Sequence, residues 1–181
     1  MSKRKQPKPD AIQYRTTTIA RAEAIDVEAR TAQLAFSSET PVERIFGNEV
    51  LSHVDDAADL SRLNDGAPLL LEHNRGDQIG VVERAWVDDD RKGRAVVRFS
   101  KSAKAQEIFQ DVQDGIRRLV SVGYSVARFV TEKADEGLDT LRAVDWMPLE
   151  ISLVSVPADN SAQVGRSDEN EPDNINQTGT K

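Results

Sequence analysis

The feature that most constrains the fold is the stretch RLVSVGYSVARFV at residues 118–130. It is rich in β-branched and aromatic residues, and it alternates with a period of two, which is the side-chain period of a β-strand. One face is apolar: Val120, Val122, Tyr124 and Val126. The other face carries small residues: Ser121, Gly123, Ser125 and Ala127. This pattern predicts a sheet with a buried face, and a second face bare enough for another backbone to approach closely.

Further strand patterns surround this run. They fall at 31–38, 78–88, 94–100, 139–146 and 149–156. The segment DDRKG at 89–93 is typical of a hairpin turn, and Pro148 separates the last two strands. Helices are predicted at 55–66 and 102–115, and an apolar stripe runs along the second: Ala105, Ile108, Phe109, Val112 and Ile116. We therefore expect a mainly β protein with packed helices (α+β), a small and mostly antiparallel β-barrel with about two helices, without the βαβ order of nucleotide-binding folds.

The length of 181 residues suits one domain with polar ends. Residues 1–10 predict a disordered basic arm, 11–165 the folded domain, and 166–181 a disordered acidic tail or linker. The net charge of −7 disfavours a nucleic-acid-binding body. No apolar run approaches the roughly 20 residues of a membrane helix, and no apolar segment follows the basic N-terminus to make a secretory signal.

Residue types also limit the available chemistry. The chain has no cysteine and two histidines, which disfavours disulfides, thiolate chemistry and a structural zinc site. Gly76 and Gly80 alone do not make a phosphate-binding loop. We expect no cofactor and no metal.

Three side chains are candidates for catalysis. Ser121 lies in mid-strand on the small-residue face, where the alternative is an ordinary polar residue on a solvated sheet. His73 follows three leucines at the polar end of a further predicted strand, and its alternative is a half-exposed hydrogen-bonding residue. Glu150 begins a largely apolar strand, so its carboxylate needs a partner, either a histidine N–H or an arginine. The arginine candidates are Arg117, Arg118 and Arg142.

Taken together, the three residues fit one kind of chemistry. A serine hydroxyl becomes a nucleophile when a base takes its proton, and a carboxylate on the far nitrogen holds a histidine base in the required tautomer. His73, Ser121 and Glu150 all fall on predicted strands, which can hold side chains rigidly.

The order LLLEHN, LVSVGY and LEISLVSVPADNSAQVG resembles the tailed-bacteriophage prohead protease family, capsid-maturation serine proteases related in fold to the herpesvirus assemblins. The resemblance extends from about residue 32 to 165 and includes the opening AFSSETPVERIFGNEVL. It implies a β-barrel surrounded by helices and a serine endopeptidase that cleaves capsid or scaffold protein, and itself, inside the assembling prohead in the host cytoplasm. It is compatible with a homodimer and implies neither nucleic acid nor membrane as partner.

Carried over by position, the family's histidine falls on His73 and its nucleophile on Ser121. The assemblins use a second histidine after the serine, whereas His53 precedes both residues here. Glu150 is therefore the first choice for the third catalytic residue and Asp145 the second. Ser125, further along the same strand face, is the rival nucleophile. An oxyanion hole of backbone N–H groups is required, and no residue indicates where it lies.

Two other interpretations remain open at this point. The chain could be a non-catalytic capsid-assembly or scaffold module of the same fold, although such a module has no need of the serine–histidine pair. It could also be an unrelated acidic β-barrel that binds a partner, which leaves the closing LEISLVSVPADN block unexplained. The C-terminal segment is either a self-cleaved tail or a linker to a capsid protein fused downstream.

Overall fold

The computed structural model describes residues 11–18 and 25–156, and the predicted arm at 1–10 and tail at 166–181 lie outside these residues. Within them the chain forms ten strands, all of which belong to one sheet, and two helices. In chain order the elements are β1 (Gln13–Thr18), β2 (Ile25–Asp26), β3 (Thr31–Ser38), β4 (Val42–Arg44), β5 (Gly47–Leu51), α1 (Ser61–Asn64), β6 (Pro68–Leu71), β7 (Asn74–Val87), β8 (Lys92–Phe99), α2 (Ala103–Gln113), β9 (Leu119–Glu132) and β10 (Thr140–Val154).

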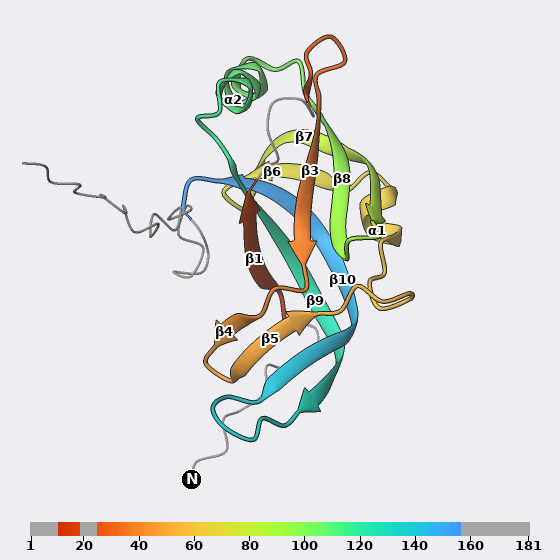
Figure 1. Ribbon diagram of the computed structural model, residues 1–181. Helices are drawn as coiled ribbons and strands as arrows, with labels where there is room; N and C mark the ends of the chain where they lie inside the picture. The colour runs from red at the N-terminus through yellow and green to blue at the C-terminus, as the bar shows by residue number, and fades with distance from the viewer. Residues whose placement is uncertain (1–10, 19–24, 157–181) are drawn as a thin grey trace, which may run out of the picture.

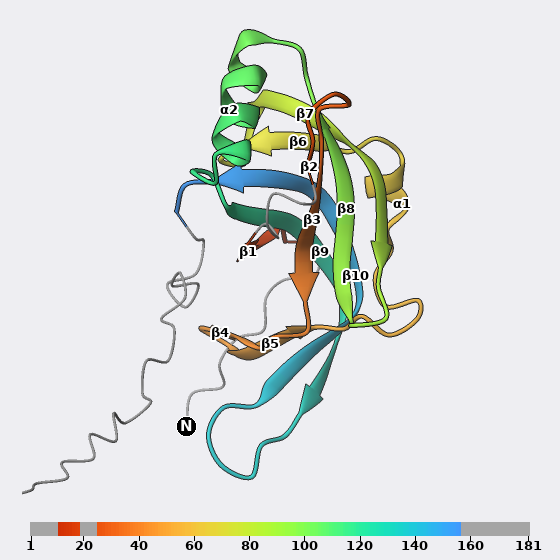
Figure 2. The ribbon, with the colours of Figure 1, turned by 45° about the horizontal axis from the view of Figure 1, so that its top comes forward.

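The sheet follows the order β1-β9-β10-β6-β7-β8-β3-β2, and β5 joins it through β10. It curls into a half-barrel, and β9 and β10 extend beyond it as a long hairpin (Figure 1). Most pairings are antiparallel, but β10 pairs in parallel with both β5 and β6. Helix α2 packs at the end of the sheet near β7 and β8 (Figure 2). The prediction of a mainly β protein with two packed helices is confirmed.

The core lies inside the curl of the sheet. The four residues predicted on the apolar face of β9 are all buried there: Val120, Val122, Tyr124 and Val126. Trp146 of β10 packs edge-on against Tyr124, with ring centroids 5.9 Å apart. Phe109 of α2 meets Phe99 at 4.7 Å, so the apolar stripe of the helix covers the end of the barrel. Ile116 does not belong to that stripe, because it follows the helix and is 71% exposed.

Buried polar groups fasten β1 to the rest of the barrel. Arg15 is 3% exposed and donates hydrogen bonds to the backbone carbonyls of Ser38, Thr40 and Glu49. The Tyr124 hydroxyl donates to Oε2 of Glu49 at 2.6 Å. Burial and the nearby Glu49 carboxylate raise the pKa of Tyr124. These contacts tie β1 and β9 to Glu49 of β5, and the antiparallel ladder between β1 and β9 places β1 beside the strand that carries Ser121.

Two sequence predictions about secondary structure were wrong in detail. The helix expected at 55–66 is reduced to Ser61–Asn64, because the backbone of Ala57 and Asp59 pairs with Trp146 of β10 rather than with a helical turn. The two strands expected on either side of Pro148 are one strand, β10, which passes through the proline at a β-bulge. Helix α2 agrees with its prediction and is capped by Ser102, whose hydroxyl accepts from the Ala105 N–H.

No helix in the described residues is long and apolar enough to span a membrane.

Candidate active site

His73 lies in the turn between β6 and β7, and not on a strand as the sequence suggested. Leu71 pairs with Asn74, so Glu72 and His73 form a two-residue hairpin turn. Their φ angles are 52° and 57°, in the left-handed region that residues other than glycine rarely adopt. The Glu72 carboxylate anchors this turn, because it accepts from the backbone N–H and the hydroxyl of Ser155. The turn therefore projects the imidazole from a tightly held backbone.

The structure brings all three predicted residues together. His73 Nε2 lies 2.8 Å from Ser121 Oγ, and His73 Nδ1 lies 2.7 Å from Glu150 Oε1. An ionised carboxylate only accepts hydrogen bonds, so the proton of a neutral His73 sits on Nδ1 and is donated to Glu150. Nε2 is then left to accept the hydroxyl proton of Ser121. This is the tautomer in which a histidine can act as a base toward a serine.

Pairing between β9 and β10 sets the positions of the other two residues. Ser121 pairs with Ser152, and Glu150 pairs with Gly123. A bulge at Leu149, between the pairs formed by Pro148 and Glu150, turns the Glu150 side chain toward the histidine. A Cβ on Gly123 would overlap Oε1 of Glu150. The glycine in the small-residue face thus provides the space that the carboxylate occupies.

Sequence reasoning missed two residues of this site. Ser152 is fully buried, and its hydroxyl donates to Oε2 of Glu150 at 2.6 Å, so both oxygens of that carboxylate are held. The period-two alternation that placed Glu150 on a strand would have put Ser152 on the same face. The second is Tyr14, whose ring centroid lies 4.1 Å from that of the His73 imidazole. Tyr14 belongs to β1, a strand that the polar sequence QYRTTT did not predict.

A pocket of about 470 Å³, called here the catalytic pocket, opens beside His73 and Glu150. Its walls combine apolar side chains from several elements with two arginines: Ile12, Tyr14, Leu70, Leu149, Arg62 and Arg75. Ser121 itself has no exposed surface, and the His73 side chain is 18% exposed. The pocket thus reaches the histidine and the carboxylate from outside, and the serine lies behind them.

The alternative residues lie elsewhere. Asp145 is exposed, and the carboxylate facing His73 belongs to Glu150. Ser125 pairs with Met147, four residues from Ser121 and so about 13 Å further along the strand. Of the arginines considered for Glu150, Arg117 instead pairs with Asp111 and Glu72, and Arg142 with Glu132.

His53 belongs to a separate, buried pair. It is 2% exposed, with Nδ1 2.9 Å from the backbone oxygen of Leu51 and Nε2 2.8 Å from Ser37 Oγ. Burial lowers its pKa. The backbone carbonyl of Leu51 orients the His53 ring, but it carries no charge that could stabilise an imidazolium, so this pair lacks the charged partner that Glu150 provides for His73.

Among the described residues, no three His, Asp or Glu side chains are arranged to hold a metal ion. A buried serine, a histidine and a carboxylate in one hydrogen-bonded row on a rigid sheet is the arrangement of hydrolases that use a serine nucleophile.

Comparison with known proteins defines the family. The family model described as caudovirus prohead serine protease matches residues 24–177, and the chain belongs to this family. The major capsid protein of Halomonas phage phiHAP-1 is 53% identical over 137 residues, which are 74% of this chain and 23% of that protein. The chain therefore spans less than a quarter of the length of this relative.

A solved structure has the same fold. The bacteriophage T4 capsid assembly protease, gp21, matches with a TM-score of 0.58 at 12% identity, over 81% of this chain and 99% of that chain. At this identity the likeness concerns the fold alone.

Proposed function

We propose that this chain is a serine endopeptidase of phage capsid maturation in which Ser121 is the nucleophile, His73 the general base and Glu150 the residue that orients the histidine. The observation that carries the proposal is the unbroken row Ser121 Oγ–His73 Nε2 and His73 Nδ1–Glu150 Oε1, with distances of 2.8 and 2.7 Å. Family membership supports protease activity independently.

The chemistry follows from the row. His73 takes the hydroxyl proton as Ser121 Oγ attacks the scissile carbonyl, and the Glu150 carboxylate stabilises the imidazolium that forms. The protonated His73 then gives its proton to the leaving amine, and a water activated by the same histidine hydrolyses the acyl-enzyme. Backbone N–H donors must stabilise the oxyanion in both steps, because loss of one such donor costs roughly 10²–10³ in rate.

The substrate we propose is capsid protein or its scaffold segment. The relative named major capsid protein supports this, because this chain resembles 23% of its length and the remainder lies outside the match. In such a protease–capsid fusion the region after the protease would join the two parts, and cleavage there would release the capsid protein. The place of action would be the assembling prohead in the host cytoplasm. The resemblance to the herpesvirus assemblins extends the proposal to their type of barrel and to a homodimer.

Co-expression with the cognate capsid protein tests the assignment. Ser121→Ala and His73→Ala should both abolish trimming of the capsid protein and of the chain itself. Ser125→Ala is the matched control on the same strand and should cleave like the wild type. Cleavage that survives both catalytic substitutions contradicts the assignment. If the wild type shows no cleavage, the alternative of a non-catalytic assembly module is favoured.

A further inference from the structure

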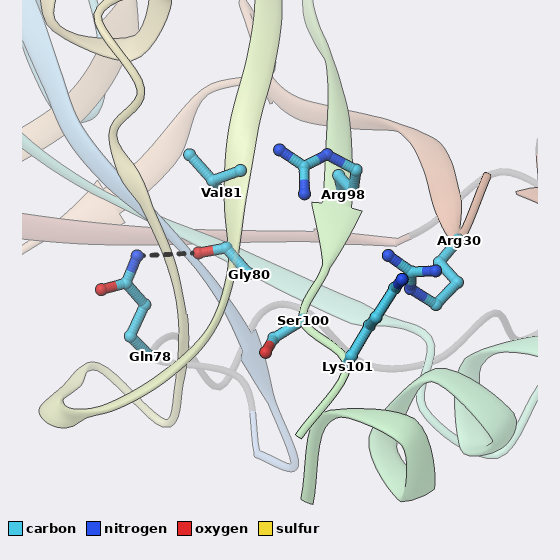
Figure 3. Close-up of a pocket in the computed structure, with 7 residues that line it drawn as sticks. All are labelled: Arg30, Gln78, Gly80, Val81, Arg98, Ser100 and Lys101. Atoms are coloured by element: carbon cyan, nitrogen blue, oxygen red, sulfur yellow. Dashed lines mark hydrogen bonds between the residues drawn. The ribbon is translucent and has the colours of Figure 1, made fainter. Parts of the chain in front are cut away.

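A second pocket, called here the cationic pocket, opens over β7 and β8 and has a volume of about 500 Å³. Three cations line it, Arg30, Arg98 and Lys101, together with the neutral donors Gln78 and Ser100 (Figure 3). None of its lining residues is acidic, in a chain with a net charge of −7. A concentration of one sign of charge in a concave site attracts ligands of the opposite sign.

The cations of this pocket are incompletely paired. Arg98 Nε contacts Glu83, and Arg30 Nε donates to the backbone oxygen of Phe99 at 3.3 Å. Within the described part of the chain, the Lys101 ammonium has neither a hydrogen bond nor an ion pair. In Figure 3 the Lys101 side chain extends toward Arg30. Like charges that line one pocket repel each other, so an anion bound there would relieve the repulsion and complete their hydrogen bonds.

The cationic pocket and the catalytic pocket lie side by side on one face of the sheet. Gln78 lines both. The strand register forms a row from the nucleophile to this glutamine, in which Ser121 pairs with Ser152, Ser152 with Leu70 and Leu70 with Gln78. Three strand spacings of ~4.8 Å separate the ends of the row by about 14 Å, the length of four or five residues of extended peptide. One peptide can therefore occupy both pockets.

The chain itself contains a segment of matching charge. Residues 168–173 read DENEPD, with four carboxylates in six positions. The last strand ends next to the catalytic turn, because the backbone N–H of Glu72 donates to the oxygen of Leu153. From Val156 to Asp168 there are 12 residues, which extended would span about 40 Å, whereas the cationic pocket lies about three strand spacings from β10. The acidic segment can reach the pocket.

We propose that the cationic pocket binds this acidic segment, residues 168–173, and so holds the residues before it over the catalytic pocket as the segment to be cut. This rests on the proposed protease function and names its substrate region, the stretch that follows the protease body. Arg30, Arg98 and Lys101 recognise the carboxylates, and Gln78 marks the border between recognition and catalysis.

Binding is measured in a protein that cannot cleave, so that the pocket assignment and the protease function are tested separately. The full chain carries Ser121→Ala together with neutralised acidic residues, Asp168→Asn, Glu169→Gln, Glu171→Gln and Asp173→Asn. A fluorescent peptide of residues 165–175 is titrated by anisotropy at low salt. We expect saturable binding, weakened about fivefold by Lys101→Gln and again by Arg30→Gln. Lys133→Gln, which removes one charge from the distant β9–β10 hairpin, should leave it unchanged.

Two further probes identify the ligand. The same peptide with its carboxylates replaced by amides should not bind. A protein that keeps its own acidic segment should bind the labelled peptide more weakly, because that segment competes for the pocket. Lys101 is exposed and without a side-chain partner in the described chain, so its substitution should leave the melting temperature unchanged.

The proposal is overturned if the neutral peptide binds as well as the acidic one, or if Lys101→Gln and Arg30→Gln have no more effect than Lys133→Gln. It is also overturned if the protein with its natural acidic segment binds the peptide as strongly as the neutralised one. Normal peptide binding combined with a chain that never cleaves would count against the protease function and leave the pocket assignment intact.

Discussion

Gly123→Ala should separate the role of Glu150 from the stability of the barrel. The added Cβ would overlap Oε1 of Glu150 and lie 3.2 Å from Cε1 of Tyr14. Both neighbours contact His73, so the methyl group would enter the site between the groups that hold the imidazole. The carboxylate is the group that must move, because Gly123 is fixed within the β9 ladder.

The size of the effect follows from the distances. Oε1 of Glu150 lies 2.7 Å from His73 Nδ1, and a shift of about 1 Å to escape the overlap takes it beyond hydrogen-bonding range. A histidine without its carboxylate loses up to about 10⁴ in kcat in a serine triad, so we expect a loss between about 10² and 10⁴. Overpacking costs about 1–3 kcal/mol of stability, which should leave the protein folded.

The assay compares cleavage of the cognate capsid protein by the variant and by Gly76→Ala. Gly76 is the matched control, because a Cβ there meets nothing nearer than Asn74 Oδ1 at 3.4 Å. The decisive comparison is made in a Glu150→Ala background, where the overlap no longer exists. If Gly123→Ala acts by displacing Glu150, it should cost little further activity there. A loss as large as in the wild-type background would refute this explanation.

Three other substitutions test other parts of the molecule. Ser152→Ala removes the donor to Oε2 of Glu150 and should lower kcat about fivefold with KM unchanged. Steady-state cleavage of a peptide substrate measures both constants, and an unchanged kcat would show that the serine does not position the carboxylate. Burial lowers the pKa of His53, so the unfolded chain binds a proton there more readily than the folded chain does. The stability contributed by neutral His53 is therefore complete above pH 6.5 and is lost as the pH falls below it. The melting temperature should therefore drop between pH 7.5 and 5.5, and less so in His53→Gln; equal slopes would exclude His53 as the cause. Arg15→Ala leaves three backbone carbonyls without their buried donor and should cost about 3 kcal/mol in denaturant unfolding, and a cost below 1 kcal/mol would mean that water replaces the guanidinium.

The part of the site that lies on regular strands could be predicted from the sequence. The alternation in β9 places Ser121 opposite the buried face, and the apolar run after Glu150 indicates a carboxylate in need of a partner. Their convergence with His73 could not be derived, because it depends on register between strands far apart in the sequence. The order of motifs in a known family supplied that step.

The errors have a common physical origin in tertiary pairing. Residues 55–60 have helix-like spacing, but Ala57 and Asp59 form backbone hydrogen bonds with Trp146 of β10, and these override local propensity. Pro148 is a strand breaker in sequence, yet the adjacent bulge accommodates a residue that has no N–H. Strand β1 has no apolar alternation, and its position depends on its ladder with β9 and on the buried hydrogen bonds of Arg15.

Each of the three proposed catalytic residues depends on a local departure from ideal sheet geometry. His73 lies in a turn whose two residues both have a left-handed backbone conformation. Glu150 follows a bulge, and Ser121 is two residues from a glycine that leaves room for the carboxylate. Each departure has a cost, of the order of 1 kcal/mol for a left-handed residue, which surrounding contacts must offset. Ser155 and Ser152 supply those contacts, and both belong to the last strand or the residue that follows it. Because the same strand leads into the segment that we propose is cut, the geometry of the site and the path of the substrate are set by one element, β10.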